Sequence, residues 1–331
     1  MKATVVCSMR NEGPFLVEWV CWYRMLGFTD LVIVTNDCTD HSPELLDHLA
    51  RAGWVHHLRS DVVPGEKVVA AKLKQARRHP AVRRADWVLV CDVDEFLVIH
   101  RGAGKLADLL APHLAESGPD MLAMAINWRV FGTSGIAEWQ DGLTHRQFRR
   151  AGPTRNWISR WIKVLHRAPL AFGTLGEHGP KRLSADKAAP PLRFVNSEGV
   201  TVPDWSPEGP YLRMLPADLT THEVAQMNHY MLRSEESWGL KQGTPSAVQG
   251  ADRYNDSYYR STNRNELRDL SALRHEAGFD LIHAEAMALP GVRRLHHLCC
   301  ADYAARLCDK AGRAVETDAR WRWHMAQAGE A

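Results

Sequence analysis

Residues 87–97 read Trp-Val-Leu-Val-Cys-Asp-Val-Asp-Glu-Phe-Leu, an apolar run that leads directly into three carboxylates. The run predicts a buried strand. Because side chains two apart on an extended segment share a face, Asp92 and Asp94 can point into one pocket. Two carboxylate ligands suit Mg²⁺ or Mn²⁺, which complete their coordination with water and substrate phosphates. The stretch indicates a divalent metal site, and the alternative is a turn that only caps the strand.

The third carboxylate, Glu95, is not predicted to be a metal ligand. On the same alternation its side chain faces away from those of Asp92 and Asp94. We expect Glu95 to hold the turn or to orient the groups around the metal.

An apolar strand that ends in acidic residues also describes the Mg²⁺-binding strand of a phosphate-loop nucleotidase. The nearest candidate for the phosphate loop, Gly104-Lys105-Leu106, lacks the following Ser or Thr and has Ile99 in place of the first glycine. No Gly-x-Gly-x-x-Gly follows the first predicted strand, so the usual dinucleotide-binding fingerprint is also missing. The acidic stretch therefore indicates a phosphate site of another class than the phosphate loop or the dinucleotide-binding fold.

Strand and helix signals alternate through the first hundred residues. Apolar runs predict strands at 4–7, 31–35, 54–58 and 87–91, and amphipathic periodicity predicts helices at 14–26, 42–52 and 66–78. Pro14 and Pro43 suit the first positions of two helices, and Gly27 and Gly53 follow their ends. The order predicts an α/β fold with a doubly wound, mostly parallel, Rossmann-like sheet. In such sheets ligands bind beyond the carboxyl ends of the strands.

The pattern loosens after residue 120. Further strands are expected at 121–128, 161–165 and 224–231, and residues 181–216, rich in proline and polar side chains, suggest an inserted or mobile loop. From about residue 234 the signals are helical. We expect one domain over residues 1–235 and a helical C-terminal extension, residues 236–331, packed on it.

Composition narrows the class of protein. With 45% hydrophobic and 24% charged residues the chain is ordinary for a globular protein, and a formal net charge of +2 argues against nucleic acid as a partner. Seven cysteines without a Cys-x-x-Cys pair suit a reducing compartment. No run approaches the roughly 18 apolar residues of a membrane span. We expect a cytoplasmic protein, with peripheral contact at the inner face of the membrane left open.

Three segments in this order resemble glycosyltransferase family 2-like proteins of the GT-A fold: Ser8-Met9-Arg10-Asn11-Glu12-Gly13-Pro14, Asn36-Asp37-Cys38-Thr39-Asp40-His41-Ser42, and residues 90–97. The Asp-Glu-Phe-Leu ending is similar to a subgroup related to the family 92 type. The resemblance implies a GT-A fold and a metal bound to the diphosphate of a sugar nucleotide. By position it assigns the nucleotide to Arg10, Asn11, Glu12 and Asp37, and the metal and diphosphate to Asp92 and Asp94.

Two later segments resemble that subgroup more faintly. Residues 127–135 look like its loop beside the acceptor, which implies acceptor contacts for Trp128 and Ser134. Asn228-His229-Tyr230 looks like its closing segment, and a histidine there completes the metal shell in related enzymes, which implies that role for His229. Charge-assisted contacts with the diphosphate are expected from Lys67, Arg233 and Lys241, with Lys163 as a further candidate.

The implied activity is a metal-dependent glycosyl transfer from a nucleoside diphosphate sugar, with UDP-sugar as the expected donor class. The acceptor would be a glycan, a lipid or another hydroxyl compound, and the cofactor Mn²⁺ or Mg²⁺. An inverting enzyme also needs a carboxylate base. The Glu-Asp pair that many family 2 enzymes carry after the acceptor loop is missing, so Glu138, Asp141 and Glu177 stay as candidates, with Asp141 favoured.

Two other classes stay open from the sequence. Because the Glu-Asp pair that would supply the catalytic base is missing, the chain could also be a catalytically inactive protein that binds a nucleotide-sugar or a glycan. The acidic pair also suits a metal-dependent nucleotidyltransferase, which would release diphosphate from a nucleoside triphosphate.

Overall fold

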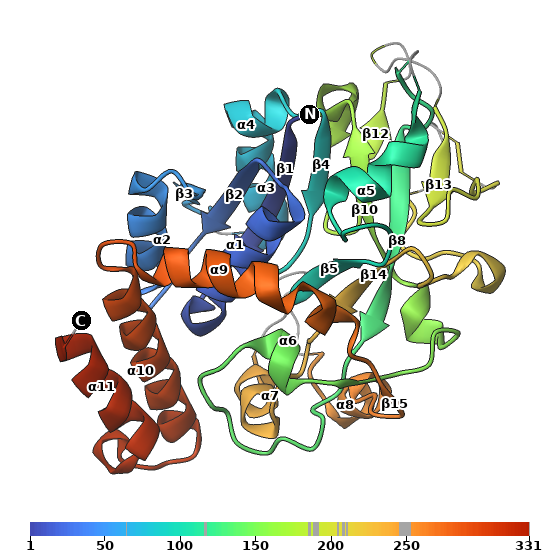
Figure 1. Cartoon of the computed structure of the whole chain (residues 1–331). Coiled ribbons are helices and arrows are strands. Elements are labelled where there is room, and N and C mark those ends of the chain that lie inside the picture. The colour runs from blue at the N-terminus through green and yellow to red at the C-terminus, as the bar shows by residue number, and fades with distance from the viewer. Residues whose placement is uncertain are drawn as a thin grey trace.

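The computed structural model describes residues 1–63, 65–115, 118–184, 187, 192–203, 205–206, 209, 211–244 and 253–330. In this part of the chain nine strands form one sheet, which Figure 1 shows running through the centre of the molecule. The strand order is β3-β2-β1-β4-β10-β8-β14-β5, and β13 pairs with β8 beside this path. Helices cover the sheet and form the C-terminal region, so the predicted α/β class is confirmed.

The first half of the sheet is parallel. It consists of β1 (Ala3–Met9), β2 (Asp30–Thr35), β3 (His56–Arg59) and β4 (Trp87–Val90), each pair in parallel register. These are the four strands that the sequence predicts, with ends that differ by one or two residues. Their carboxyl ends lie at one edge, which brings together the loops after β1, β2 and β4.

Helices cover both faces of this half of the sheet. Val5 and Cys7 of β1 point into the core that holds α1 (Gly13–Leu26) and α2 (Ser42–Arg51). Val6, between them, points to the opposite face, where it packs with Leu73 of α3 (Val68–Arg78) near α4 (Pro80–Arg83). Side chains that alternate between two apolar layers are the mark of a doubly wound sheet, as predicted.

The second half of the sheet mixes directions. Strand β10 (Ile162–Arg167) runs antiparallel between β4 and β8 (Ala123–Val130). Next to β8 lie β14 (Ala225–His229), which is parallel to it, and then the antiparallel edge strand β5 (Glu95–Ile99). The chain thus leaves β4 at the centre of the sheet and starts β5 at its far edge. The sequence does not predict β5 as a strand of its own.

Helix α1 is the most deeply buried helix of the first half and fixes the connection between β4 and β5. The indole nitrogens of Trp19 and Trp22 donate to the carbonyls of Asp92 and Leu97 over 3.0 and 2.8 Å. The Tyr23 hydroxyl donates to the carbonyl of Glu95 over 3.1 Å. All three side chains are fully buried, so these bonds satisfy backbone groups that water does not reach.

The short elements complete the description. They are α5 (Leu106–Leu110), β6 (Leu114–Ala115), β7 (Gly118–Pro119), α6 (Thr144–Gln147), β9 (Arg150–Ala151), β11 (Phe172–Thr174), β12 (Lys181–Leu183), β13 (Phe194–Asn196) and β15 (Leu267–Arg268). Residues 181–216, predicted to be a loop, thus contain two short strands, and several of these residues lie outside the described part.

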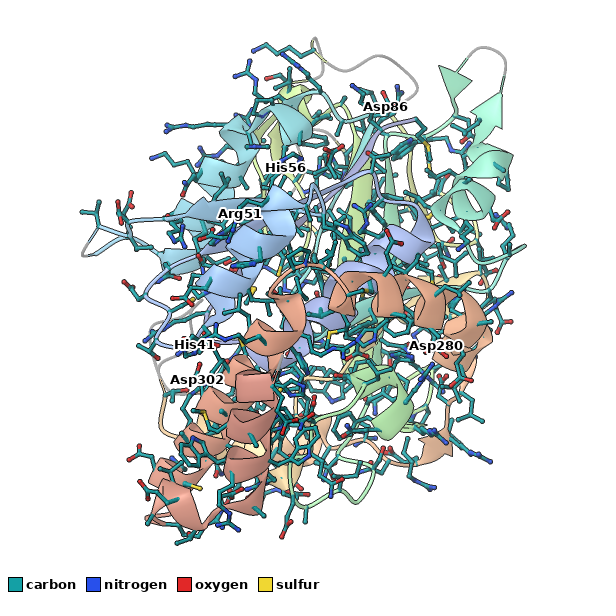
Figure 2. All side chains as sticks on the ribbon, turned by 60° about the vertical axis from the view of Figure 1, so that its left-hand side comes forward. His41, Arg51, His56, Asp86, Asp280 and Asp302 are labelled. Atoms are coloured by element: carbon teal, nitrogen blue, oxygen red, sulfur yellow. The ribbon has the colours of Figure 1, made fainter. Side chains whose placement is uncertain are left out.

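The C-terminal region contains α7 (Glu235–Lys241), α8 (Asp256–Thr262), α9 (Glu276–Met287), α10 (Val292–Lys310) and α11 (Ala319–Glu330). Helices α9 and α10 pack against α1, and α10 also packs against α2. At the start of α2, His41 Nδ1 lies 2.6 Å from the carboxylate of Asp302 on α10; Figure 2 labels both. No described helix is long and apolar enough to cross a membrane.

A close approach between α1 and α10 requires a glycine at position 13. A Cβ atom on Gly13 would lie 2.4 Å from Sγ and 2.5 Å from Cβ of Cys299. Since the Cys299 Cβ is fixed to the helix backbone, the two helices would have to separate.

We predict that Gly13→Ala lowers the free energy of unfolding by about 1–3 kcal/mol because of this overlap. Gly278→Ala on α9 is the matched control, since an added Cβ meets nothing within 4 Å there. Alanine's higher helix propensity should stabilise that variant by up to about 1 kcal/mol. Urea unfolding followed by circular dichroism measures both, and equal midpoints for the two variants would contradict the packing argument.

Candidate active site

A cavity of about 540 Å³ opens at the carboxyl ends of β1 and β4 and is also lined by residues of the second half of the sheet, Trp128 of β8 and His229 of β14. Its wall combines carboxylates, cations and aromatic rings. The acidic groups are Glu12, Asp92, Asp94 and Glu177; the basic ones are Arg10, Lys67, Lys72, Lys181, Arg213, Lys241 and Arg253; the aromatic ones include Trp128, Trp157, Trp161, Tyr211, Tyr254 and Tyr258. The cavity is therefore suited to a polar ligand with an anionic part and a flat or ring-shaped part.

Asp92 and Asp94 both line this cavity, but not as alternate residues of an extended strand. Strand β4 ends at Val90, and the amide of Glu95 donates to the carbonyl of Asp92 over 3.1 Å, which closes a turn over residues 92–95. We call this segment the acidic turn. The Tyr230 amide also donates to the carbonyl of Asp94 over 2.8 Å. Backbone bonds on both sides thus fix the turn.

A buried lysine pairs with two of the three carboxylates. Nζ of Lys163, on β10, lies 3.0 Å from Oδ2 of Asp92 and 2.8 Å from Oε2 of Glu95. Burial would lower the pKa of Lys163, but these carboxylates hold it well above its ordinary value, so the ammonium stays charged. Burial raises the pKa of Glu95 to about 7, although Lys163 opposes this shift.

Glu95 holds the turn, yet it does not face away from its neighbours as the strand alternation predicts. Its Oε2 accepts a hydrogen bond from the amide of Asp92 over 2.8 Å. Its side chain is fully buried, and Oε1 lies 3.7 Å from Nδ1 of His229. The prediction of its direction is wrong because the acidic segment is a turn, in which side chains do not alternate between two faces.

Asp94 lies beside an imidazole and an ammonium group. Its carboxylate is 3.5 Å from Nε2 of His229 and 3.4 Å from Nζ of Lys241. Burial would raise the pKa of Asp94, but the charges of Lys241, His229 and Arg233 outweigh it and hold this pKa well below its usual value. The carboxylate is therefore ionised, while the side chain of Asp92, 45% exposed, reaches into the cavity.

The donor set of Asp92, Asp94 and His229 offers two carboxylates and an imidazole at the cavity wall. Among the described residues, the groups of three side chains whose ligand atoms lie within 4.8 Å of one another involve Asp141 instead. The ligand atoms of Asp92, Asp94 and His229 thus do not all lie close together, and they leave coordination positions of a bound ion free for other ligands. An open set fits Mg²⁺ or Mn²⁺, which take several oxygen ligands from water and phosphate.

The residues predicted to bind the nucleotide divide into two groups. Arg10, Glu12 and Lys67 line the cavity. Asn11 and Asp37 do not; both have left-handed backbones, with φ of 55° and 44°, and the side-chain oxygen of Asn11 accepts from the Thr39 amide. Asparagine and aspartate tolerate this conformation better than most residues. The structure therefore places Asn11 and Asp37 in the loops after β1 and β2, outside the wall of the cavity.

The predicted phosphate-binding cations also divide. Lys241 lines the cavity, and its ammonium donates to the carbonyl of Met231. Arg233 is 3% exposed and lies behind the wall, where it donates to Glu12 over 2.9 Å and covers the ring of Phe15. Arg233 thus contacts the cavity only through Glu12 and the field that it exerts on Asp94.

Of the three predicted base candidates, the structure places Glu177 in the cavity. Burial and the charge of Asp92 raise the pKa of this half-buried carboxylate. Glu138 is exposed and Asp141 lies beside His296, 3.2 Å from its Nε2, and neither lines the cavity. The preference for Asp141 as the base thus finds no support in its position, because the loop that carries it turns toward the C-terminal helices.

The acceptor-binding candidates are also separated. Trp128 lines the cavity and stacks on Trp161 with ring centroids 5.6 Å apart; the exposed Trp157 also lines the cavity. Ser134 does not line it; its hydroxyl accepts from the amides of Arg149 and Arg150. The glycine-bearing loop that contains Ser134 is held by side-chain oxygens of the C-terminal region instead of facing a ligand.

Several cavity residues escape prediction from the sequence. Arg253, Tyr254 and Tyr258 belong to the C-terminal region, so residues beyond the predicted boundary at 235 build the site together with the first domain. Lys181 and Tyr211 come from the segment predicted to be a loop. None of these residues carries a local pattern that marks it, because each reaches the site through tertiary packing.

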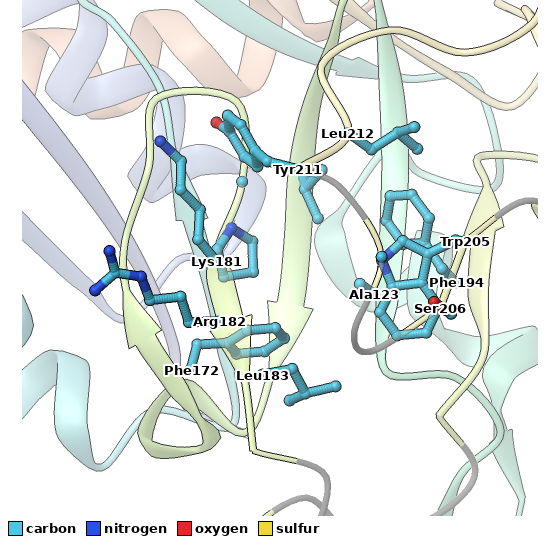
Figure 3. A pocket seen from close by; sticks show the side chains of 14 residues that line it. Ala123, Phe172, Lys181, Arg182, Leu183, Phe194, Trp205, Ser206, Tyr211 and Leu212 are labelled. Atoms are coloured by element: carbon cyan, nitrogen blue, oxygen red, sulfur yellow. The ribbon is translucent and has the colours of Figure 1, made fainter.

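A second cavity of about 410 Å³ shares Lys181 and Tyr211 with the first, and Lys181 Nζ lies 4.1 Å from the centre of the Tyr211 ring. Figure 3 shows its mostly apolar wall, which includes Phe172, Phe194 and Trp205. The two cavities are therefore adjacent, with this cation and ring between them.

No family model matches the chain. It is 29% identical over 135 residues to a glycosyltransferase family 92 protein of Ricinus communis, a match that covers 40% of this chain and 23% of that protein. The chain thus spans less than a quarter of the length of this curated relative. The match confirms the resemblance that the sequence segments indicate, and the subgroup stays a prediction.

Three solved structures are among those that the chain matches. They are a mannosyltransferase from Pyrobaculum calidifontis with GDP-Man and Mn²⁺ (16% identity, 99% of this chain, 84% of that one, TM-score 0.37), TarS residues 1–349 of S. aureus with UDP-GlcNAc (14%, 100% and 92%, 0.35), and glucosyl-3-phosphoglycerate synthase of Mycobacterium tuberculosis with Mn²⁺, UDP and phosphoglyceric acid (14%, 66% and 72%, 0.30). At TM-scores below 0.5 these likenesses say nothing about the activity of this chain.

We predict that Lys163→Met lowers the free energy of unfolding by about 3–5 kcal/mol, because it leaves Glu95 buried without its ammonium partner. Lys67→Met is the matched control: Lys67 is exposed at the same cavity and should change stability by less than about 0.5 kcal/mol. Urea unfolding at neutral pH measures the difference. The ion-pair argument fails if both variants unfold at the midpoint of the unchanged protein.

Proposed function

We propose that this protein is a metal-dependent glycosyltransferase that uses a nucleoside diphosphate sugar, with UDP-sugar as the expected donor class, and a glycan, lipid-linked or other hydroxyl acceptor. One observation carries the proposal: the acidic turn at the carboxyl end of β4 presents Asp92 and Asp94 to a cavity that also contains cations and tryptophans. The carboxylates of the cavity can bind a metal ion and its cations can bind a diphosphate. Sugar rings can pack against the indole faces of its tryptophans.

Asp92, Asp94 and His229 are the residues that would hold Mn²⁺ or Mg²⁺. A divalent cation bound there supplies a Lewis acid for the leaving diphosphate. Lys241 neutralises phosphate charge from a fixed position, because its ammonium is already tied to Asp94 and to the carbonyl of Met231. Lys67 and Arg253, on the same wall, add charge where the diphosphate would lie.

The same cavity provides a base and an acceptor platform. Glu177 accepts the proton of the attacking hydroxyl, and its raised pKa favours that step at neutral pH. The stacked pair of Trp128 and Trp161 offers a flat apolar surface to an acceptor or donor sugar. Of the predicted binding residues, Asn11, Asp37 and Ser134 act in this proposal by shaping loops.

We predict that Asp92→Asn and Asp94→Asn each reduce release of the nucleoside diphosphate by at least about 100-fold. The assay measures UDP or GDP released from a panel of nucleoside diphosphate sugars with an acceptor mixture, with Mn²⁺ and with EDTA. Asp86→Asn is the control, because Asp86 lies at the opposite end of β4 and accepts from the Lys2 amide. Its activity should not change.

Full activity of Asp94→Asn, or of the unchanged protein in EDTA, would contradict the metal role of the acidic turn. Binding of UDP without turnover of any donor would instead support a protein that binds nucleotide-sugars without catalysis. Release of diphosphate from a nucleoside triphosphate would support the nucleotidyltransferase alternative.

We predict that Glu177→Gln lowers kcat by about 10²–10⁴-fold with little change in the KM for the donor, because the base acts on the acceptor. Glu138→Gln is the matched control, since Glu138 is exposed and outside the cavity. Steady-state kinetics of both variants decide the assignment. A loss in Glu138→Gln, or unchanged kcat in Glu177→Gln, would move the base away from Glu177.

A further inference from the structure

Outside the cavity, metal-ligating side chains from three separate segments meet at Asp141. His296, His297 and Cys300 come from α10, His324 comes from α11, and Asp141 comes from the loop before α6. In each of two overlapping groups, Asp141 with His296 and Cys300, and Asp141 with His297 and His324, the ligand atoms all lie within 4.8 Å of one another. Figure 1 shows α10 and α11 side by side, at the end of the molecule away from β13.

We propose that this cluster binds one Zn²⁺ through Asp141, His296 and Cys300, and that a nitrogen of His297 or His324, which already approaches the same carboxylate, moves closer to supply the fourth ligand. The site is separate from the acidic turn and does not depend on the proposed glycosyl transfer. Its role would be structural: it would fix the C-terminal helices to the loop that carries Asp141. A carboxylate, imidazoles and a thiolate form a donor set typical of zinc in proteins.

The distances between ligand atoms suit a tetrahedral zinc ion. Zinc bonds of about 2.0 Å to oxygen or nitrogen and 2.3 Å to sulfur, at tetrahedral angles, separate oxygen from nitrogen by about 3.3 Å and nitrogen from sulfur by about 3.6 Å. In the structure, Oδ2 of Asp141 lies 3.2 Å from Nε2 of His296, and Sγ of Cys300 lies 3.6 Å from the same nitrogen. Both distances from Nε2 of His296 thus match those between ligands of one ion, and the carboxylate and the thiol lie within 4.8 Å of each other.

Hydrogen bonds can also join these three groups, but only in one protonation state of His296. If Nε2 of His296 carries a proton, it can donate to Asp141, and the thiol of Cys300 can donate to the same carboxylate. If Nε2 is unprotonated, it accepts from Cys300 but faces the carboxylate of Asp141 with a lone pair. The other ring nitrogen of His296 is buried without a hydrogen-bond partner. A cation at this place would replace the shared protons and accept a lone pair from each of the three groups.

The chain geometry also favours a shared ion. His296 and Cys300 are four residues apart on α10, so their side chains lie on one face of the helix. Nδ1 of His297 lies 3.0 Å from Nδ1 of His324, which brings α11 to the same carboxylate. Cys300 is fully buried, whereas the side chain of Asp141 is 25% exposed and leaves a path for the ion.

The test uses the full-length protein, purified without chelator for elemental analysis and then stripped of metal and titrated with Co²⁺. Thiolate-bound tetrahedral Co²⁺ gives visible d–d bands and a sulfur charge-transfer band. We expect about one equivalent of zinc in the purified protein, these bands at one equivalent of Co²⁺, and their loss when Zn²⁺ but not Mn²⁺ is added. Metal should also raise the thermal midpoint.

Variants locate the ion. Cys300→Ser should abolish the charge-transfer band, and His296→Ala should weaken Co²⁺ binding by at least about 100-fold. Cys299→Ser is the matched control, because it removes the neighbouring thiol outside the cluster. The double variant Asp92→Asn with Asp94→Asn should keep the bands, which separates this site from the acidic turn.

Absence of zinc and of the Co²⁺ bands in the unchanged protein would overturn the proposal, and this result requires no variant to fold. Retention of the sulfur band in Cys300→Ser, or its loss in Cys299→Ser, would also overturn it. Failure of the glycosyltransferase assay would leave these measurements unaffected, so the two proposals can fail independently.

Discussion

The buried ammonium of Lys163 is the interaction on which the acidic turn depends. It lies within 3.0 Å of carboxylate oxygens from both Asp92 and Glu95, and Glu95 in turn binds the amide of Asp92. Without this positive charge, a fully buried glutamate would share a small volume with two aspartates. Like charges at this distance repel strongly where water is excluded. The antiparallel insertion of β10 next to β4 is what brings Lys163 to this place. The same strand, β10, therefore makes the sheet mixed and supplies the positive charge that the acidic turn needs.

The α1 helix supplies the second constraint. Its buried indoles and tyrosine bind carbonyls between Asp92 and Leu97, so the chain can leave the centre of the sheet and cross to its far edge without unsatisfied backbone groups. The cost of this arrangement is a helix that is apolar on nearly every side, which α9 and α10 must cover. The C-terminal helices are thus part of the same core as the first domain, and they also carry residues of the cavity.

The sequence predicts the parallel half of the fold because its signals are local. Proline and glycine mark the ends of α1 and α2, and each apolar run corresponds to one strand. The second half depends on pairing between distant segments, such as β5 with β14, and periodicity carries no information about which strands pair. The same limit applies to the site. Asp92 and Asp94 follow a predicted strand, but Arg253 and Tyr258 reach the cavity only through packing, and Asp141 faces α10. The predicted direction of the Glu95 side chain is wrong for a local reason, because residues 92–95 form a turn and not the extended strand that the prediction assumed.

Charge neutralisation at the acidic turn has a consequence for the proposed metal. Asp92 and Asp94 each already lie near an ammonium group, from Lys163 and Lys241 respectively. The turn is thus stable without a divalent ion, and an incoming ion gains less from carboxylates whose charge is partly balanced. A diphosphate changes this balance, because its negative charges attract the lysines and also provide oxygen ligands. Under the proposed function, the ion and the sugar nucleotide should therefore bind together more tightly than either alone, because each compensates the charge that the other brings.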